Sequence, residues 1–148
     1  MKLTASVEVD APTPVVMSVV TDLATYPQWL DIVGNVRTDE QTADDPGPAW
    51  FVDLRAQLGP LRRSKRLRMV RAVADDRSVR FERRELDGRS HSPWLLAADL
   101  VTMDDDRTQV TMRLDYGGSM WLPMLDRLLA EEIRRARPRL KAVLEAAG

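Results

Sequence analysis

The side chains that could carry chemistry are few, and the only histidine among them is His91. It lies in Arg89-Ser90-His91-Ser92-Pro93-Trp94, the most unusual local stretch of the chain. In a strand, Ser90 and Ser92 point to the side opposite His91, so this spacing does not make a Ser–His dyad. His91 is a candidate general base or hydrogen-bonding partner of a ligand. The alternative is a surface histidine near the end of a strand.

Cationic side chains on predicted strands are the second group of candidates. Arg83 has the parity of Phe81, while Arg63 and Lys65 have the parity of Leu67. Such residues could hold a carboxylate, phosphate or enolate oxygen at the mouth of a pocket. The alternative is that they stand near strand ends, where both faces of a sheet are wet.

The basic stretch of residues 62–68 raises the possibility of a nucleic-acid site. On a strand its charges are divided between two faces, so no single surface collects them all. The formal net charge of −1 also argues against nucleic acid as the main partner. We therefore predict a solvated strand here and no nucleic-acid partner.

Other kinds of site are excluded by composition. Cysteine is absent, which removes disulfides, thiolate catalysis and cysteine-based metal sites. A single histidine cannot build a histidine-rich metal site. The clustered aspartates at 44–45, 75–76 and 104–106 fall in predicted turns, where turn chemistry explains them. We expect no metal and no cofactor, and we assign no residue a catalytic role.

Strands must position most of these side chains. Residues 2–10 alternate between apolar and polar types, which is typical of a half-buried strand. Two short helices are expected within 13–31, with Thr13 capping the first and Thr21 or Asp22 starting the second. About six antiparallel strands then follow as one curved meander. We place them at 32–40, 50–58, 61–74, around Val79 and Phe81, at 90–103 and at 107–116.

Parity in the strand predicted at 90–103 decides where its side chains point. Trp94, Leu96, Ala98 and Leu100 form the better inward set, because the other choice buries Asp99. That parity sends His91 outward unless Pro93 distorts the strand. In the strand predicted at 32–40, Gly34 marks the expected position of a β-bulge or of a close backbone approach.

A long helix from Ser119 to Ala147 ends the chain. Pro138 lies in its interior and predicts a kink near residues 134–137. The apolar start at residues 120–125 must be covered on more than one side. The inward stripe repeats every three or four residues and comprises Leu125, Leu129, Ile133, Ala136, Leu140, Val143 and Leu144.

Length and composition point to one ordinary globular domain. We expect residues 1–148 to form a single domain, with 44% hydrophobic and 30% charged residues. No apolar run approaches the length of a membrane span, and residues 1–5 do not look like a signal peptide. We therefore expect a cytoplasmic protein without an integral membrane segment. The oligomeric state is left open.

Three stretches carry a resemblance to a known family. They are residues 7–20, residues 22–29 with the pattern Tyr26-Pro27-Gln28-Trp29, and residues 107–116 leading into the terminal helix. With the predicted order of elements, the chain resembles the START-like or SRPBCC superfamily, the polyketide cyclase/dehydrase and lipid-transport group. The resemblance implies an α+β helix-grip fold, in which a curved antiparallel sheet of about seven strands wraps a long C-terminal helix, with two short helices after the first strand.

The family resemblance also implies a cavity between sheet and helix. We expect it to bind a small hydrophobic or amphipathic ligand, such as a lipid, a polyketide or a quinone-like molecule, by desolvation. There are two alternatives. One is an enzyme of the polyketide cyclase/aromatase type, and the other is a toxin-like module that binds a partner through its surface. Large apolar side chains would line the cavity and a few polar groups would orient the ligand. The candidates are Met17, Trp29, Trp50, Leu54, Met69, Phe81, Arg83, His91, Trp94, Met112, Tyr116, Trp121, Met124, Leu125 and Leu128.

Overall fold

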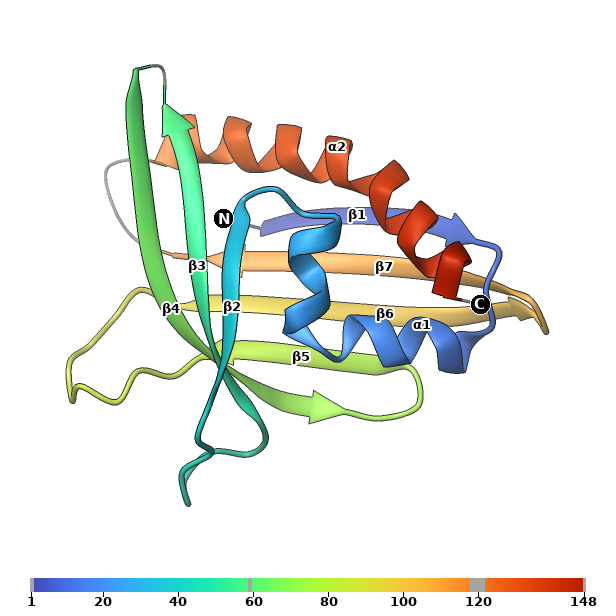
Figure 1. The fold of residues 1–148 in the computed structure, drawn as a ribbon, viewed down its shortest axis with the longest axis horizontal. Coiled ribbons are helices and arrows are strands. Elements are labelled where there is room, and N and C mark those ends of the chain that lie inside the picture. The colour runs from blue at the N-terminus through green and yellow to red at the C-terminus, as the bar shows by residue number, and fades with distance from the viewer. Residues whose placement is uncertain (1, 59, 118–121, 148) are drawn as a thin grey trace.

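The computed structural model describes residues 2–58, 60–117 and 122–147 and shows a curved sheet crossed by one long helix (Figure 1). These residues form seven strands, two short helices and one long helix, joined by loops. In chain order they are β1 (Lys2–Val9), α1 (Thr13–Val20), the 3₁₀ helix η1 (Leu23–Gln28), β2 (Val33–Asp39), β3 (Ala49–Leu58), β4 (Leu61–Ala74), β5 (Ser78–Arg83), β6 (Trp94–Asp104), β7 (Arg107–Tyr116) and α2 (Leu122–Ala147).

The sheet is antiparallel throughout and follows the order β1-β7-β6-β5-β4-β3-β2. The predicted meander of six strands is therefore confirmed, and β1 joins its far end. Lys2 faces Asp115 and Val9 faces Thr108 across the β1–β7 pair. Helix α2 crosses the same end of the sheet and packs against β1 (Figure 1). This is the helix-grip arrangement that the resemblance implied.

Two strands differ from their predicted form. The strand predicted at 90–103 begins only at Trp94, because the chain from residue 84 to Pro93 is a loop. The inward parity holds: Trp94 and Leu96 pack against the core, and Ala98 and Leu100 are part of it. In β2, the register shifts between Val33 and Val36, as Gly34 predicted.

The cap predicted for α1 is wrong. Pro12 occupies the N-cap position, and Thr13 is already helical. The Thr13 hydroxyl instead shares hydrogen bonds with the hydroxyls of Thr102, at 2.7 Å, and Thr108, at 3.1 Å. These contacts fasten α1 to β6 and β7, which single-residue preferences cannot foresee. The second cap is confirmed, because Asp22 accepts a hydrogen bond from the Ala24 amide at 3.0 Å.

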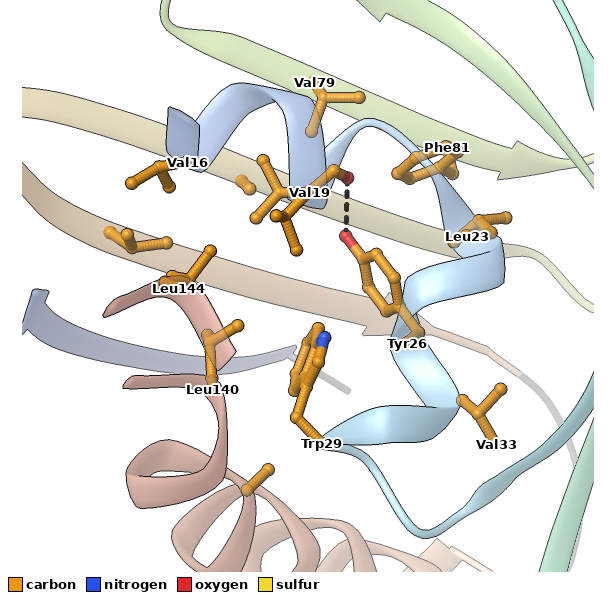
Figure 2. Packing of buried hydrophobic residues seen from close by; sticks show 14 of the residues in the cluster. Val16, Val19, Leu23, Tyr26, Trp29, Val33, Val79, Phe81, Leu140 and Leu144 are labelled. Atoms are coloured by element: carbon orange, nitrogen blue, oxygen red, sulfur yellow. Dashed lines mark hydrogen bonds between the residues drawn. The ribbon is translucent and has the colours of Figure 1, made fainter. Parts of the chain in front are cut away.

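Aromatic rings fill the core beneath α1 and η1. Tyr26 contacts Trp29 with ring centroids 4.6 Å apart, and Phe81 lies edge-on to both Tyr26 and Trp50, at 6.1 and 5.6 Å. The Tyr26 hydroxyl donates to the Val20 carbonyl at 2.9 Å (Figure 2). Burial holds the pKa of Tyr26 far above its ordinary value. The C-terminal half of α2 closes on this same core through Leu140 and Leu144 (Figure 2).

A buried arginine joins β4 to the loop between β2 and β3. Only 1% of the Arg68 side chain is exposed, and it donates to Asp39 and Asp45, both at 2.7 Å. These bonds hold the pKa values of both carboxyls below their usual range. The prediction of a solvated strand is thus correct for residues 62–66, which are exposed, and wrong for Arg68. The loop that buries Arg68 comes from a distant part of the chain.

Helix α2 runs unbroken through Pro138. Figure 1 shows it changing direction in its C-terminal half, in keeping with the predicted kink. The predicted start at Ser119 lies outside the described residues. Of the predicted stripe, Leu129, Ala136, Leu140 and Leu144 are buried.

Candidate ligand cavity

An apolar cavity of about 120 Å³ lies between the sheet and α2. Strands β1, β2, β3, β4, β6 and β7 contribute to its wall on one side, and η1 and α2 on the other. Five of the predicted ligand-binding residues line it. They are Trp29, Leu54, Met69, Trp94 and Met112. Strand parity placed all of them except Trp29 on the inner face, whereas Trp29 follows η1.

Sequence reasoning missed other apolar residues of the wall. They come mainly from η1, the segment after it, the centre of the sheet and the helix stripe. Examples are Tyr26, Leu30, Val36, Val52, Leu114 and Ile133. Periodicity was the available signal for Ile133, which belongs to the predicted helix stripe. Val36, Val52 and Leu114 lie on predicted strands, where alternation was the available signal.

The remaining predicted residues lie away from the lining as the structure describes it. Trp50 and Phe81 are buried in the core, where they pack on each other. Tyr116 is buried and stacks on Trp94 with ring centroids 5.2 Å apart. Met17 and Leu128 are half-buried. Trp121 lies outside the described residues, as do the side chains of Met124 and Leu125, so their ligand-binding role stays a prediction.

Arg83 and His91 meet each other in a polar network beyond the end of β5. Arg83 donates to Glu85 at 2.6 Å and to the Ser92 carbonyl at 3.2 Å, and its Nη2 lies 3.4 Å from His91 Nδ1. The other ring nitrogen of His91 lies 2.8 Å from Asp87. Neither residue is part of the cavity wall. The network holds the loop before β6, and a ligand role for either side chain stays a prediction.

Glu132 is the acidic residue of the cavity wall, and the predictions did not include it. The residue is only 8% exposed, but the surface that faces the cavity is almost entirely apolar, so the carboxylate, which is bonded to Arg135, is not part of that surface. Arg135, one helical turn on, donates to its Oε1. The signal was present in the helix pattern, because Glu132 follows Leu129 by three residues and precedes Ala136 by four. That spacing puts it on the flank of the buried stripe.

An ion pair links α2 to the segment after η1. Arg139 lies 2.5 Å from Asp31, and about half of each side chain is exposed. The hydrogen bond from Arg139 lowers the pKa of the Asp31 carboxyl. Arg139 follows Glu132 by seven residues, or two turns, so both stand on the flank of α2 that faces Asp31. Glu132 is therefore on the flank of α2 that faces the segment after η1.

One buried donor beside the cavity has no acceptor. The indole Nε1 of Trp29 is buried without a hydrogen-bond partner in the described part of the chain. Figure 2 shows this nitrogen on the edge of the indole nearer to Tyr26. An unsatisfied buried donor costs about 1–3 kcal/mol. The packing of the rings must offset that cost.

A sheet that grips a long helix over an apolar cavity defines the START-like class of proteins. Among solved structures, the chain is similar to a START superfamily protein from Mycobacterium smegmatis, with TM-score 0.77 and 19% identity over 99% of both chains. The Zhui aromatase/cyclase from Streptomyces sp. R1128 gives TM-score 0.69 and 16% identity over 98% of this chain and 93% of that one. A conserved protein from Geobacillus kaustophilus gives 0.71 and 14%, over 99% and 97%.

The sequence profile of the polyketide cyclase/dehydrase and lipid transport family matches residues 1–145, and the chain belongs to this family. No curated protein sequence matches it. Family and fold together indicate a role in binding a hydrophobic ligand. None of the described helices is both long enough and apolar enough to cross a membrane.

Proposed function

We propose that this protein binds and carries a small hydrophobic or amphipathic molecule in the cavity beneath α2. The observation that carries the proposal is the apolar wall shared by the sheet, η1 and α2. Each ligand methylene that moves from water into such a cavity contributes about 0.8 kcal/mol. A ligand with four or five buried carbons therefore gains about 3–4 kcal/mol from desolvation alone.

The size of the cavity restricts what enters without rearrangement. Its free volume is about 120 Å³. An apolar cavity of about 150 Å³ holds one benzene ring. The end of a chain or one small ring is therefore close to the largest group that the cavity holds as it stands. A fused polycyclic ligand requires α2 to move away from η1, which breaks the Asp31–Arg139 ion pair.

Glu132 favours a ligand with a polar end. Its carboxylate accepts hydrogen bonds, so once it turns from Arg135 toward the cavity it suits a hydroxyl or ammonium donor on the ligand. A hydrogen bond to a charged group contributes about 1.5–3 kcal/mol. Its present partner, Arg135, has a side chain that is 50% exposed, so Arg135 can turn to solvent when a ligand takes its place.

The experiment begins with native mass spectrometry of the freshly purified protein and solvent extraction of any bound molecule. Toluene, benzyl alcohol and benzylamine then serve as probes that share one ring and differ in their donor group. We expect all three to bind, with benzylamine about tenfold tighter than toluene. If no molecule co-purifies and none of the three probes binds, the carrier proposal is wrong.

Two variants separate the role of Glu132 from that of the helix surface. Glu131 and Glu132 each pair with the arginine three residues on, but only Glu132 lines the cavity. Glu132→Gln should remove the preference for benzylamine, while Glu131→Gln should keep it. Equal preference in both variants would show that Glu132 does not contact the ligand.

A cyclase-type enzyme is the second candidate, and Glu132 is also the observation that favours it. Proton abstraction next to a carbonyl needs a base within hydrogen-bond reach of the substrate. The Glu132 carboxylate would meet that need by turning from Arg135 into the cavity, whereas His91 lies outside the wall. Incubation with a reactive poly-β-ketone chain separates the candidates. Turnover that Glu132→Gln abolishes while binding persists would favour the enzyme.

A further inference from the structure

The β3–β4 hairpin extends beyond the rest of the sheet. The last β2–β3 pair joins Val33 to Leu54, and pairing of β4 with β5 begins only at Met69. One further backbone hydrogen bond, from the Arg55 amide to the Ile32 carbonyl, connects the base of the hairpin to the segment before β2. From there to the turn the described residues form a two-stranded ribbon, and Figure 1 shows this ribbon rising past the end of β2.

Positive charge is concentrated on this ribbon. The chain from Leu54 to Ala74 contains no acidic residue. Five basic side chains of the ribbon are exposed, and we call them the basic hairpin: Arg55, Arg62, Arg63, Lys65 and Arg66. Asp53 offsets one charge, since it lies 3.0 Å from Arg66. Parity divides the five between two faces, but in the described residues no third strand pairs with the ribbon beyond Arg55, so both faces are presented to whatever its end approaches.

The opposite charge gathers at the other end of the molecule. The turns at Asp75–Asp76 and Asp104–Asp106 lie at the end of the sheet away from the hairpin (Figure 1). The formal net charge of the whole chain is only −1. A negatively charged surface that meets the hairpin is therefore attracted by its basic side chains, while these acidic turns lie away from it.

We propose that the basic hairpin docks this protein on an anionic lipid surface. No residue from 56 to 61 carries a charge, so nothing in this part of the sequence opposes the positive charge of the hairpin. Charges beyond about 10 Å are screened at 0.1 M salt, so a flat surface interacts with the near end only. A long nucleic acid would offer the same phosphates, but the stretch lacks the interleaved aromatic residues that stack on bases.

The root of the hairpin links docking to the cavity. Leu54 lines the cavity and is the register partner of Lys65. The basic hairpin thus begins where the cavity wall ends. A membrane held by the hairpin lies close to the wall through which an apolar ligand would pass. Docking does not depend on which ligand the cavity holds, so it can be tested separately.

Co-sedimentation with vesicles tests the proposal on the full chain. The vesicles are phosphatidylcholine alone or phosphatidylcholine with a quarter phosphatidylserine, at 0.05 M and 0.5 M salt. The hairpin variant changes Arg62, Lys65 and Arg66 to Gln. The control changes Arg77, Arg80 and Arg89 to Gln, because these three residues are also exposed and lie outside the hairpin. Both variants lose the same three charges.

We expect the protein and the control to bind phosphatidylserine vesicles at low salt, to release them at high salt, and not to bind phosphatidylcholine alone. The hairpin variant should bind about 100-fold more weakly, given the contribution of each basic residue near such a surface. Toluene binding should be unchanged in all three proteins. Absence of vesicle binding, equal loss in the two variants, or tighter binding to a duplex DNA than to the vesicles would each overturn the proposal.

Discussion

Ala136→Leu fills the cavity from the helix side, and its effect follows from the geometry. Ala136 lines the cavity and is only 5% exposed. The substitution adds three carbon atoms, which contribute about 2.4 kcal/mol if all are buried, at about 0.8 kcal/mol each. An independent figure comes from the cavity itself. Filling about 120 Å³ at about 24 cal/mol per Å³ gives about 2.9 kcal/mol.

The two figures agree, and both assume an ideal fit. We expect the free energy of unfolding to rise by about 1–2 kcal/mol, because some packing adjustment is unavoidable. The assay is urea denaturation followed by tryptophan fluorescence. Ala142→Leu is the control, since Ala142 is exposed on the same helix and the chemical change is identical. The control should change the free energy of unfolding by only about 0.2 kcal/mol, because alanine and leucine differ little in helix propensity.

The same variant must also lose ligand binding. Toluene should no longer bind to Ala136→Leu and should bind normally to Ala142→Leu. If Ala136→Leu were instead about 1 kcal/mol less stable than the control, the space beneath α2 would already be filled. The cavity, and the proposed function with it, would then be refuted.

Three further predictions concern the frame around the cavity. Asp45→Asn should cost about 2 kcal/mol at neutral pH. Because Arg68 depresses the folded-state pKa of Asp45, wild-type stability falls as pH drops below about 4, so urea midpoints of variant and wild type should converge there. Gly47→Ala should lower the melting temperature sharply, since a Cβ would lie 2.3 Å from the Arg71 carbonyl oxygen. Tyr26→Phe should cost about 1 kcal/mol in urea titrations, with unchanged toluene binding.

Order and parity of the strands were readable from the sequence because they depend on local alternation. The inward set of β6 is the clearest case: Trp94 and Leu96 reach the cavity wall, and Ala98 and Leu100 reach the core. Parity gives the face of a sheet on which a side chain lies. It does not say what covers that face.

What covers each face is decided by distant parts of the chain. Trp50 and Phe81 point inward as predicted, yet Phe81 is covered by Tyr26 of η1, and Trp50 packs on Phe81. Glu132 was overlooked because its burial depends on the segment after η1. Arg68 was assigned to a solvated strand because the aspartates that bury it lie 23 and 29 residues away. His91 lies in the loop before β6, whereas the sequence predicted it within a strand.

The pairing of β1 with β7 has a consequence for how the molecule is made. Ser6 and Thr111 share a hydrogen bond of 2.8 Å across 105 residues. Helix α2, which follows β7, then packs against β1. During synthesis, β1 therefore has no partner strand until β7 has left the ribosome. The cavity is lined by both β1 and α2, so it can form only after α2 has been synthesised.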